Sequence, residues 1–227
     1  MKPADLIRRA LDVTVAAAGL VVLVPVIGSS ALAVRVTMGP GVLFRQERLG
    51  LAGRPFMLLK LRTMRQPVPG RDGPEFDSER MTKIGTWLRA SSIDELPSLW
   101  NLFRGDISLV GPRPLPKHYW HRYRGQEFRR FEVKPGITGL AQVSGRNLVD
   151  WPDRLALDVR YVERRSLLGD LRILLRTVPT VLSGAGVSNG QVVTMHALPD
   201  DRPDDRPDAS PDVSPDDSPG GRHGPVV

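Results

Sequence analysis

Residues 89–114 read RASSIDELPSLWNLFRGDISLVGPRP, and this stretch predicts the centre of the fold. Asp94 and Glu95 stand next to each other in it. They are followed by apolar residues at helical spacing: Leu96, Leu99, Trp100, Leu102 and Phe103. Ser92 and Glu95 have the S-x-x-E form of a capping box, and Pro97 is tolerated near a helix start because its missing N–H costs little there. We therefore expect both acids in the first turn of a helix.

The position of these acids suits phosphoryl chemistry. The macrodipole of a helix favours ionised carboxylates at its N-terminus, and an ionised Asp94 there would be a nucleophile for an electrophilic phosphorus. The same spacing also fits two acids that only cap the helix. Arg89 before the pair and the rigid, cationic Gly111-Pro112-Arg113-Pro114 after it favour the catalytic interpretation.

Composition predicts one domain with appendages. A chain of 227 residues buries one good core, and the absence of Cys excludes disulfides and thiolate metal sites. The four His are too scattered to predict a zinc site.

The charge is distributed unevenly along the chain. Residues 199–227 hold eight Asp and three Arg, a net charge of −5. Because the overall net charge is +7, residues 1–198 carry +12. Such a basic body requires an anionic partner: nucleic acid, an acidic membrane surface or phosphorylated substrates. Aromatic residues are few and no nucleic-acid motif is present, so we predict membrane and phosphate and no nucleic acid.

The N-terminal segment is predicted to enter a membrane. Residues 13–34 carry no charge, and a straight helix of that length covers about 33 Å, enough for a bilayer core. We reject a signal peptide because the apolar run is long and no cleavage pattern precedes Arg35. Pro25 predicts a kink at the middle of the run. Both flanks are basic, which favours a re-entrant hairpin over a spanning helix.

Short elements are expected in the remainder of the body. Residues 42–49 and 54–64 predict a β-hairpin that carries Arg45, Arg48, Lys60 and Arg62, either for phosphate binding or as a solvated strand face. A helix is expected over 82–90 and a buried strand over 107–110. Residues 116–131 mix aromatic and basic side chains as membrane interfaces do.

A glycine-rich segment, two helices and a disordered tail are predicted for the rest of the chain. A glycine-rich segment, 134–147, allows either close approach to a ligand or turns. A helix over 150–166 should bury Trp151, Leu155, Val159 and Val162 and turn Asp158 elsewhere. An apolar helix over 167–183 should break near Pro179 and either pack on the core or lie in the membrane interface. The Asp/Pro/Ser-rich residues 199–227 predict a disordered tail.

The chain resembles the bacterial sugar transferases, the monotopic phosphoglycosyl transferases. The resemblance rests on VLFRQERLG, FMLLKLRTM, LRASSIDELPSLWNLFRGDISLVGPRPL, KPGITGLAQVSGRN and LDVRYVERRSLLGDLRILLRTV. It covers about residues 5–190. The family breaks its membrane helix at a Ser-Pro pair, where this chain has Val24-Pro25, so Ser29 or Ser30 would have to supply the hydroxyl.

The resemblance implies an activity and the residues that carry it. A phospho-sugar would pass from a UDP-sugar donor to a polyprenol phosphate such as undecaprenyl phosphate, with release of UMP, in a ping-pong cycle. Asp94 would form the covalent intermediate and bind Mg²⁺, while Glu95 would position the metal or assist proton transfer. Lys60, Arg89, Arg113 and Arg146 fall on family positions for phosphate and nucleotide binding.

We therefore predict an α+β fold, mostly α, in three parts. Residues 1–36 form a re-entrant membrane helix; residues 37–198 form one compact catalytic domain with a small β-hairpin and interfacial amphipathic helices; residues 199–227 form the tail. The resemblance implies the cytoplasmic face of the bacterial inner membrane, with membrane lipids as partners, and leaves the sugar and a homodimer open. A non-enzymatic membrane-anchored adaptor that binds anionic lipid is the alternative, in which Asp94 and Glu95 only cap a helix.

Overall fold

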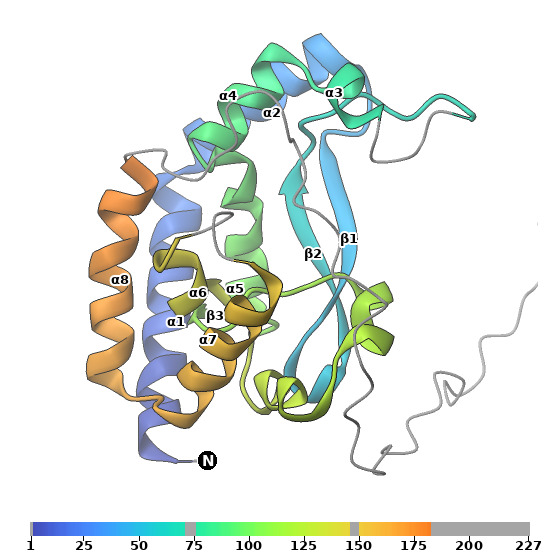
Figure 1. Ribbon diagram of the computed structural model, residues 1–227. Helices are drawn as coiled ribbons and strands as arrows, with labels where there is room; N and C mark the ends of the chain where they lie inside the picture. The colour runs from blue at the N-terminus through green and yellow to red at the C-terminus, as the bar shows by residue number, and fades with distance from the viewer. Residues whose placement is uncertain (1, 71–75, 146–149, 183–227) are drawn as a thin grey trace, which may run out of the picture.

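The computed structural model describes residues 2–70, 76–145 and 150–182 (Figure 1). The α-helices are α1 (Pro3–Val22), α2 (Val24–Met38), α3 (Asp77–Arg80), α4 (Lys83–Ala90), α5 (Leu99–Arg104), α6 (Leu140–Val143), α7 (Trp151–Glu163) and α8 (Leu167–Leu182). The strands are β1 (Leu43–Leu49), β2 (Pro55–Leu61), β3 (Ser108–Val110) and β4 (Gly136–Thr138). Helices of the 3₁₀ type are η1 (Leu51–Gly53), η3 (Ile93–Ser98), η4 (Lys117–Arg122) and η5 (Gly125–Glu132). The predicted α+β class with a predominance of helix is confirmed.

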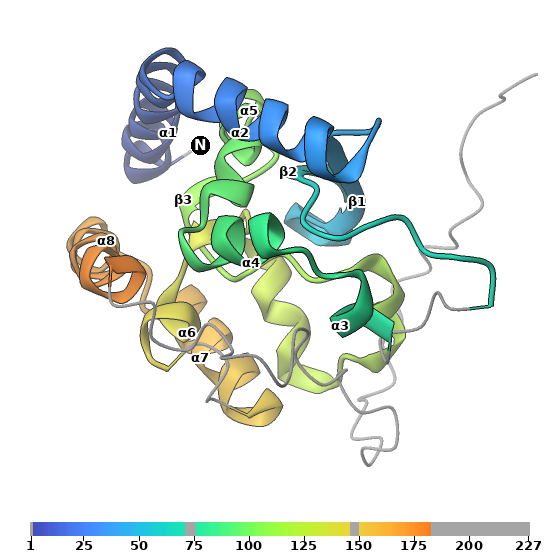
Figure 2. The same ribbon diagram turned by 90° about the horizontal axis from the view of Figure 1, so that it is seen from above.

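The N-terminal apolar segment is a bent pair of helices. α1 and α2 meet at an angle of 61° with only Leu23 between them. Pro25 follows the break and has no N–H to donate to the carbonyl four residues back, which explains the kink there. Figure 2 shows α2 leading away from α1 toward the hairpin. Among the described residues no single helix is long and apolar enough to cross a bilayer, but this bent pair meets those criteria together.

Ser29 does not replace the hydroxyl of the family's Ser-Pro pair. Its Oγ donates to the Val26 carbonyl at 3.2 Å, within α2 itself, and so makes no hydrogen bond to the carbonyls at the break. Ser30 is buried at 6% exposure, and no hydrogen bond of its side chain reaches the break in the described part of the chain.

Polar groups on α1 attach this helix to the rest of the domain. The buried Asp12 carboxylate accepts hydrogen bonds from Ser108 Oγ at 2.9 Å and from the Leu109 N–H at 2.8 Å. Arg9 donates to the carbonyls of Leu102 and Phe103 at the end of α5. These bonds tie the first half of α1 to β3 and α5.

Two small sheets frame the site. β1 and β2 pair antiparallel from Leu43↔Leu61 to Leu49↔Pro55, which confirms the predicted hairpin, and β3 and β4 pair in parallel. Gly136 and Gly139 serve the second pairing, since a Cβ on Gly139 would lie 2.2 Å from the Gly111 carbonyl oxygen. Their role is close backbone packing, which the sequence reading did not consider.

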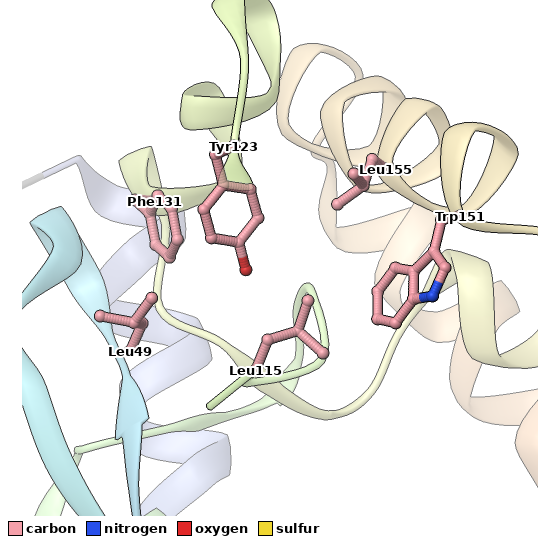
Figure 3. Packing of buried hydrophobic residues seen from close by; sticks show 6 residues of the cluster. All are labelled: Leu49, Leu115, Tyr123, Phe131, Trp151 and Leu155. Carbon is pink, nitrogen blue, oxygen red and sulfur yellow. The ribbon is translucent and has the colours of Figure 1, made fainter. Parts of the chain in front are cut away.

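The largest core cluster joins β1, the loop after β3, η5 and α7. Figure 3 shows its buried members: Leu49, Leu115, Tyr123, Phe131, Trp151 and Leu155. Tyr123 and Phe131, in the stretch expected at a membrane interface, instead face inward, with 1% and 7% of their surfaces exposed. The interface prediction is therefore wrong for these two rings, because they pack edge-to-face on each other and against neighbouring aromatic rings inside the core.

Two expectations for the last helices are also corrected. Asp158 was expected to turn away from the core but is 2% exposed, because it pairs with the buried Arg130. α8 runs without interruption from Leu167 to Leu182 with Pro179 inside it, so the predicted break is absent from the described helix. Residues 146–149 and the tail from 199 onward lie outside the described residues.

Candidate active site

The two acids lie in a 3₁₀ helix and not in the first turn of an α-helix. Ser92 has a left-handed backbone (φ 57°) and makes no capping bond, so the predicted capping box is wrong. The reversal at Ser92 leads the chain from α4 into η3, and α5 begins only at Leu99. Left-handed geometry is uncommon for a residue with a Cβ and costs about 1 kcal/mol.

Glu95 is held by two cations from distant parts of the chain. Lys60 Nζ on β2 donates to Glu95 Oε1 at 2.5 Å, and Arg113 Nη2, from the loop after β3, donates to the same oxygen at 2.8 Å. Burial alone would raise the pKa of Glu95, but the charges of Lys60 and Arg113 outweigh burial and hold this pKa well below its usual range. Glu95 is therefore a permanent anion, bound within the site.

Asp94 has the opposite environment. The residue is 7% exposed, and within the described residues its carboxylate makes no hydrogen bond or ion pair. Burial, followed by the neighbouring Glu95 charge, raises the pKa of Asp94 from 3.8 to about 6, although Lys60, Arg89 and Arg113 oppose the shift. The expectation that a helix start lowers this pKa is wrong, because burial outweighs the N–H groups of a short 3₁₀ turn.

Arg89 lies beside Asp94 without pairing with it. The side chain leaves the end of α4 and its Nε donates to Thr63 Oγ1 at 3.0 Å. Its charge is among those that lower the pKa of Asp94, and burial lowers its own pKa. Arg89 is thus placed to contact an anion that approaches Asp94.

Asn101 joins the helix that follows the acids to the strand that carries Lys60. This side chain is 2% exposed, accepts a hydrogen bond from Leu59 N–H at 3.0 Å and donates to the Met57 carbonyl at 2.8 Å. These bonds lie just before Lys60 on β2 and fix the strand against α5. A polar residue inside the apolar run LWNLF was the signal that could have identified it.

A buried network holds the loop that carries Arg113. Arg130 Nη2 donates to the Arg113 carbonyl and to Asp158 Oδ2, both at 2.8 Å, and Nη1 donates to the Tyr123 hydroxyl at 2.7 Å. Arg48 Nη1 donates to the next carbonyl along the chain, that of Pro114, at 3.1 Å. Sequence reasoning missed Arg130, Asp158 and Tyr123, because their separation in the chain hides the contact.

The predicted phosphate-binding residues separate into three groups. Lys60, Arg89 and Arg113 come together around Asp94 and Glu95. Of the other hairpin cations, Arg62 donates to the carbonyls of Met38, Gly39 and Pro40 after α2, and Arg45 is exposed. Arg146 lies outside the described residues.

A preformed metal cage is absent from the described part of the chain. No group of three or more His, Asp or Glu side chains there is arranged to hold a metal ion. One carboxylate, that of Asp94, is available, since Glu95 is bound to two cations. A single carboxylate completed by substrate oxygens and water is a ligand set that Mg²⁺ accepts.

Comparison with known proteins identifies the class. The family model described as bacterial sugar transferase matches residues 3–184, and the chain belongs to this family. The transferase prediction is thereby confirmed over the adaptor alternative.

Three relatives show how the family varies. The chain is 43% identical over 189 residues to an uncharacterized sugar transferase, EpsL, of Bacillus subtilis (strain 168), covering 83% of this chain and 94% of the relative. It is also 43% identical to the UDP-glucose:undecaprenyl-phosphate glucose-1-phosphate transferase of Caulobacter vibrioides (strain ATCC 19089 / CIP 103742 / CB 15), covering 79% of this chain and 71% of the relative. Identity is 37% to a UDP-galactose-lipid carrier transferase of Erwinia amylovora, with coverage of 79% and 41% respectively.

Proposed function

We propose that the protein transfers a phospho-sugar from a UDP-sugar to a polyprenol phosphate such as undecaprenyl phosphate. The observation that carries the proposal is the buried Asp94 carboxylate, which has no bonded partner among the described residues and is surrounded by Lys60, Arg89 and Arg113. Relatives named for glucose and for galactose support the reaction class and leave the sugar open.

In the first half-reaction an Asp94 oxygen attacks the β-phosphorus of the donor. The bond from that phosphorus to the bridging oxygen breaks, UMP leaves with that oxygen, and an acyl-phosphate to the sugar-phosphate forms on Asp94. In the second half-reaction an oxygen of the polyprenol phosphate attacks the same phosphorus. The acyl-phosphate bond then breaks, which returns the carboxylate and gives the polyprenyl diphosphate sugar.

Lys60, Arg89 and Arg113 assist by neutralising the diphosphate. Because Glu95 stays ionised and binds two of them, its proposed role is to hold these cations at fixed positions and not to transfer a proton. Asp94 would hold Mg²⁺ together with diphosphate oxygens, and the bound ion would supply further neutralisation of the transferring group.

We also propose that α1 and α2 enter the cytoplasmic leaflet of the inner membrane and return to the same side. Both ends of the pair are tied to one domain: Arg165, after α7, donates to Asp5 at 2.9 Å, and Arg62 binds the carbonyls that end α2. Apolar side chains are exposed near the bend, among them Val21, Val22, Val24 and Leu32. This exposure supports contact with lipid tails.

The test is release of UMP from a panel of UDP-hexoses, with undecaprenyl phosphate and Mg²⁺, by the full chain in detergent. We expect release with at least one donor, its loss on addition of EDTA, and its loss in Asp94→Asn. Unchanged release by Asp94→Asn would contradict the role of Asp94.

A further inference from the structure

A second cationic site lies between the end of α7 and α8, outside the region of Asp94. It is a groove of about 260 Å³, and its lining includes four arginines: Arg160, Arg164, Arg172 and Arg176. No Asp or Glu lines it, and it shares no residue with the network of Asp94, Glu95, Lys60 and Arg113.

Among the described residues these arginines have no counter-ion, because the nearby acids pair with other side chains. Glu163 pairs with Arg129, and Asp170 pairs with Arg8 and accepts a hydrogen bond from the Tyr161 hydroxyl. Within the described ranges none of the four guanidinium groups forms an ion pair or a hydrogen bond to another side chain. Four like charges around one groove repel one another unless an anion is bound.

The groove borders an exposed apolar stripe. On α8 the side chains of Leu168, Leu171, Leu175 and Val178 are each at least half exposed. At 100° per residue, Arg172 and Arg176 project between this stripe and the buried Ile173, which lines the groove with them. Apolar side chains flanked by arginines are the arrangement that a helix adopts in the headgroup region of a bilayer.

α8 has the position that such a contact requires. It lies on the same side of the molecule as α1 in Figure 1, and the side chain of Arg8 on α1 bridges to it, with Nε donating to Asp170 Oδ2 at 2.6 Å. α1 exposes Leu6, Ile7 and Leu11 in the same part of the molecule. If α1 enters a membrane, α8 would therefore contact the surface of the same membrane.

We propose that the groove binds the phosphate of an anionic glycerophospholipid, such as phosphatidylglycerol, from the surrounding membrane. Guanidinium groups bind phosphate oxygens in bidentate geometry, and four of them exceed the charge of one phosphodiester. The occupant is a bulk lipid and not the acceptor substrate, because the acceptor phosphate must reach Asp94. The inference rests on the proposed membrane placement and assigns the groove an anchoring role.

Native mass spectrometry of the full chain in neutral detergent tests the proposal, with phosphatidylglycerol, phosphatidylcholine and undecaprenyl phosphate titrated separately. We expect phosphatidylglycerol to bind more tightly than phosphatidylcholine, and Arg172→Gln/Arg176→Gln to weaken its binding roughly 10- to 30-fold, at about 1 kcal/mol per arginine. Arg160→Gln/Arg164→Gln should behave alike. Arg54→Gln/Arg65→Gln, which removes the same charge at exposed positions elsewhere, should leave binding unchanged.

Three outcomes would overturn the proposal: equal affinity for the two phospholipids, full affinity in both groove variants, or tighter binding of undecaprenyl phosphate at the groove. The variant Arg172→Lys/Arg176→Lys keeps the positive charge and should retain most of the lipid binding. It therefore shows whether the Gln variant loses binding through loss of charge or through misfolding. Because binding is measured without turnover, a negative result here is distinct from failure of UMP release.

Discussion

Asp94 and Glu95 are joined by one peptide bond, yet their carboxylates have opposite surroundings. Glu95 accepts hydrogen bonds from Lys60 and Arg113, whereas Asp94 has no bonded partner among the described residues. Correspondingly, the pKa of Glu95 is lowered and that of Asp94 is raised to about 6. Glu95 is therefore a fixed anion that holds two cations in place, whereas the Asp94 carboxylate is available to react.

Replacement of Glu95 by Gln should disable the site without removing the nucleophile. Lys60 and Arg113 would lose their common counter-ion and shift away from the diphosphate, so we expect kcat for UMP release to fall about 100-fold. Lys60→Met combined with Glu95→Gln should cost little more than either change alone, because the groups act as a unit. Glu47→Gln, which alters an exposed hairpin carboxylate, is the control. Fully additive losses would contradict a shared role.

Asp94→Asn should stabilise the fold in a pH-dependent manner. The folded-state pKa of Asp94 is raised from 3.8 to about 6, so ionisation is less favourable in the folded protein than in the unfolded chain. The resulting penalty is absent below pH 4, grows as the pH rises to 6 and is complete above it. At pH 8 without metal we expect the variant to be more stable by about 1–3 kcal/mol.

Thermal unfolding of both proteins between pH 4 and pH 8, in EDTA, measures this difference. The two midpoints should converge at pH 4. A variant that is less stable at pH 8 would show that Asp94 has a favourable partner.

The buried network behind Arg113 should affect donor binding. Tyr123→Phe removes the hydroxyl that accepts from Arg130 and should cost about 1.5 kcal/mol of stability, and Asp158→Asn about 3 kcal/mol. Because Arg130 also holds the Arg113 carbonyl, we expect a higher KM for the UDP-sugar among the molecules that remain folded. Tyr119→Phe, on a ring packed against the same cluster, is the control. A fall in kcat alone, with KM unchanged, would indicate a purely structural role.

Membrane topology can be mapped with single cysteines, since the chain has none of its own. Lys2→Cys and Ala156→Cys place exposed thiols before α1 and on α7. A re-entrant α1–α2 pair predicts that a membrane-impermeant maleimide labels both in inverted vesicles and neither in spheroplasts. Labelling of the two positions from opposite faces would show that the segment spans the membrane.

The sequence predicted the local elements more accurately than their contacts. The hairpin and the bend at Pro25 follow from short-range rules of pleat and proline geometry. The helix start at Ser92 failed because tertiary packing reversed the chain there, which no S-x-x-E spacing reveals. The burial of Asp158 was also missed, since its partner Arg130 lies 28 residues away and belongs to a different element.

The proximity of three cations to the two acids was predicted, but the pairing between these groups was not. Lys60, Arg89 and Arg113 were expected near the acids, and all three lie around Asp94 and Glu95. That two of them bind Glu95, and leave Asp94 free, depends on the positions of β2 and the loop after β3. Only the folded chain fixes those positions.

Intact-protein mass spectrometry tests the central proposal, nucleophilic catalysis by Asp94, most directly. The full chain is incubated with Mg²⁺ and the UDP-sugar that it accepts, without polyprenol phosphate, and its mass is measured. We predict a gain of one sugar-phosphate group, localised to Asp94, absent in Asp94→Asn and removed when undecaprenyl phosphate is added. Turnover with acceptor present but no adduct in its absence, or an adduct that persists in Asp94→Asn, would contradict a covalent intermediate on this residue.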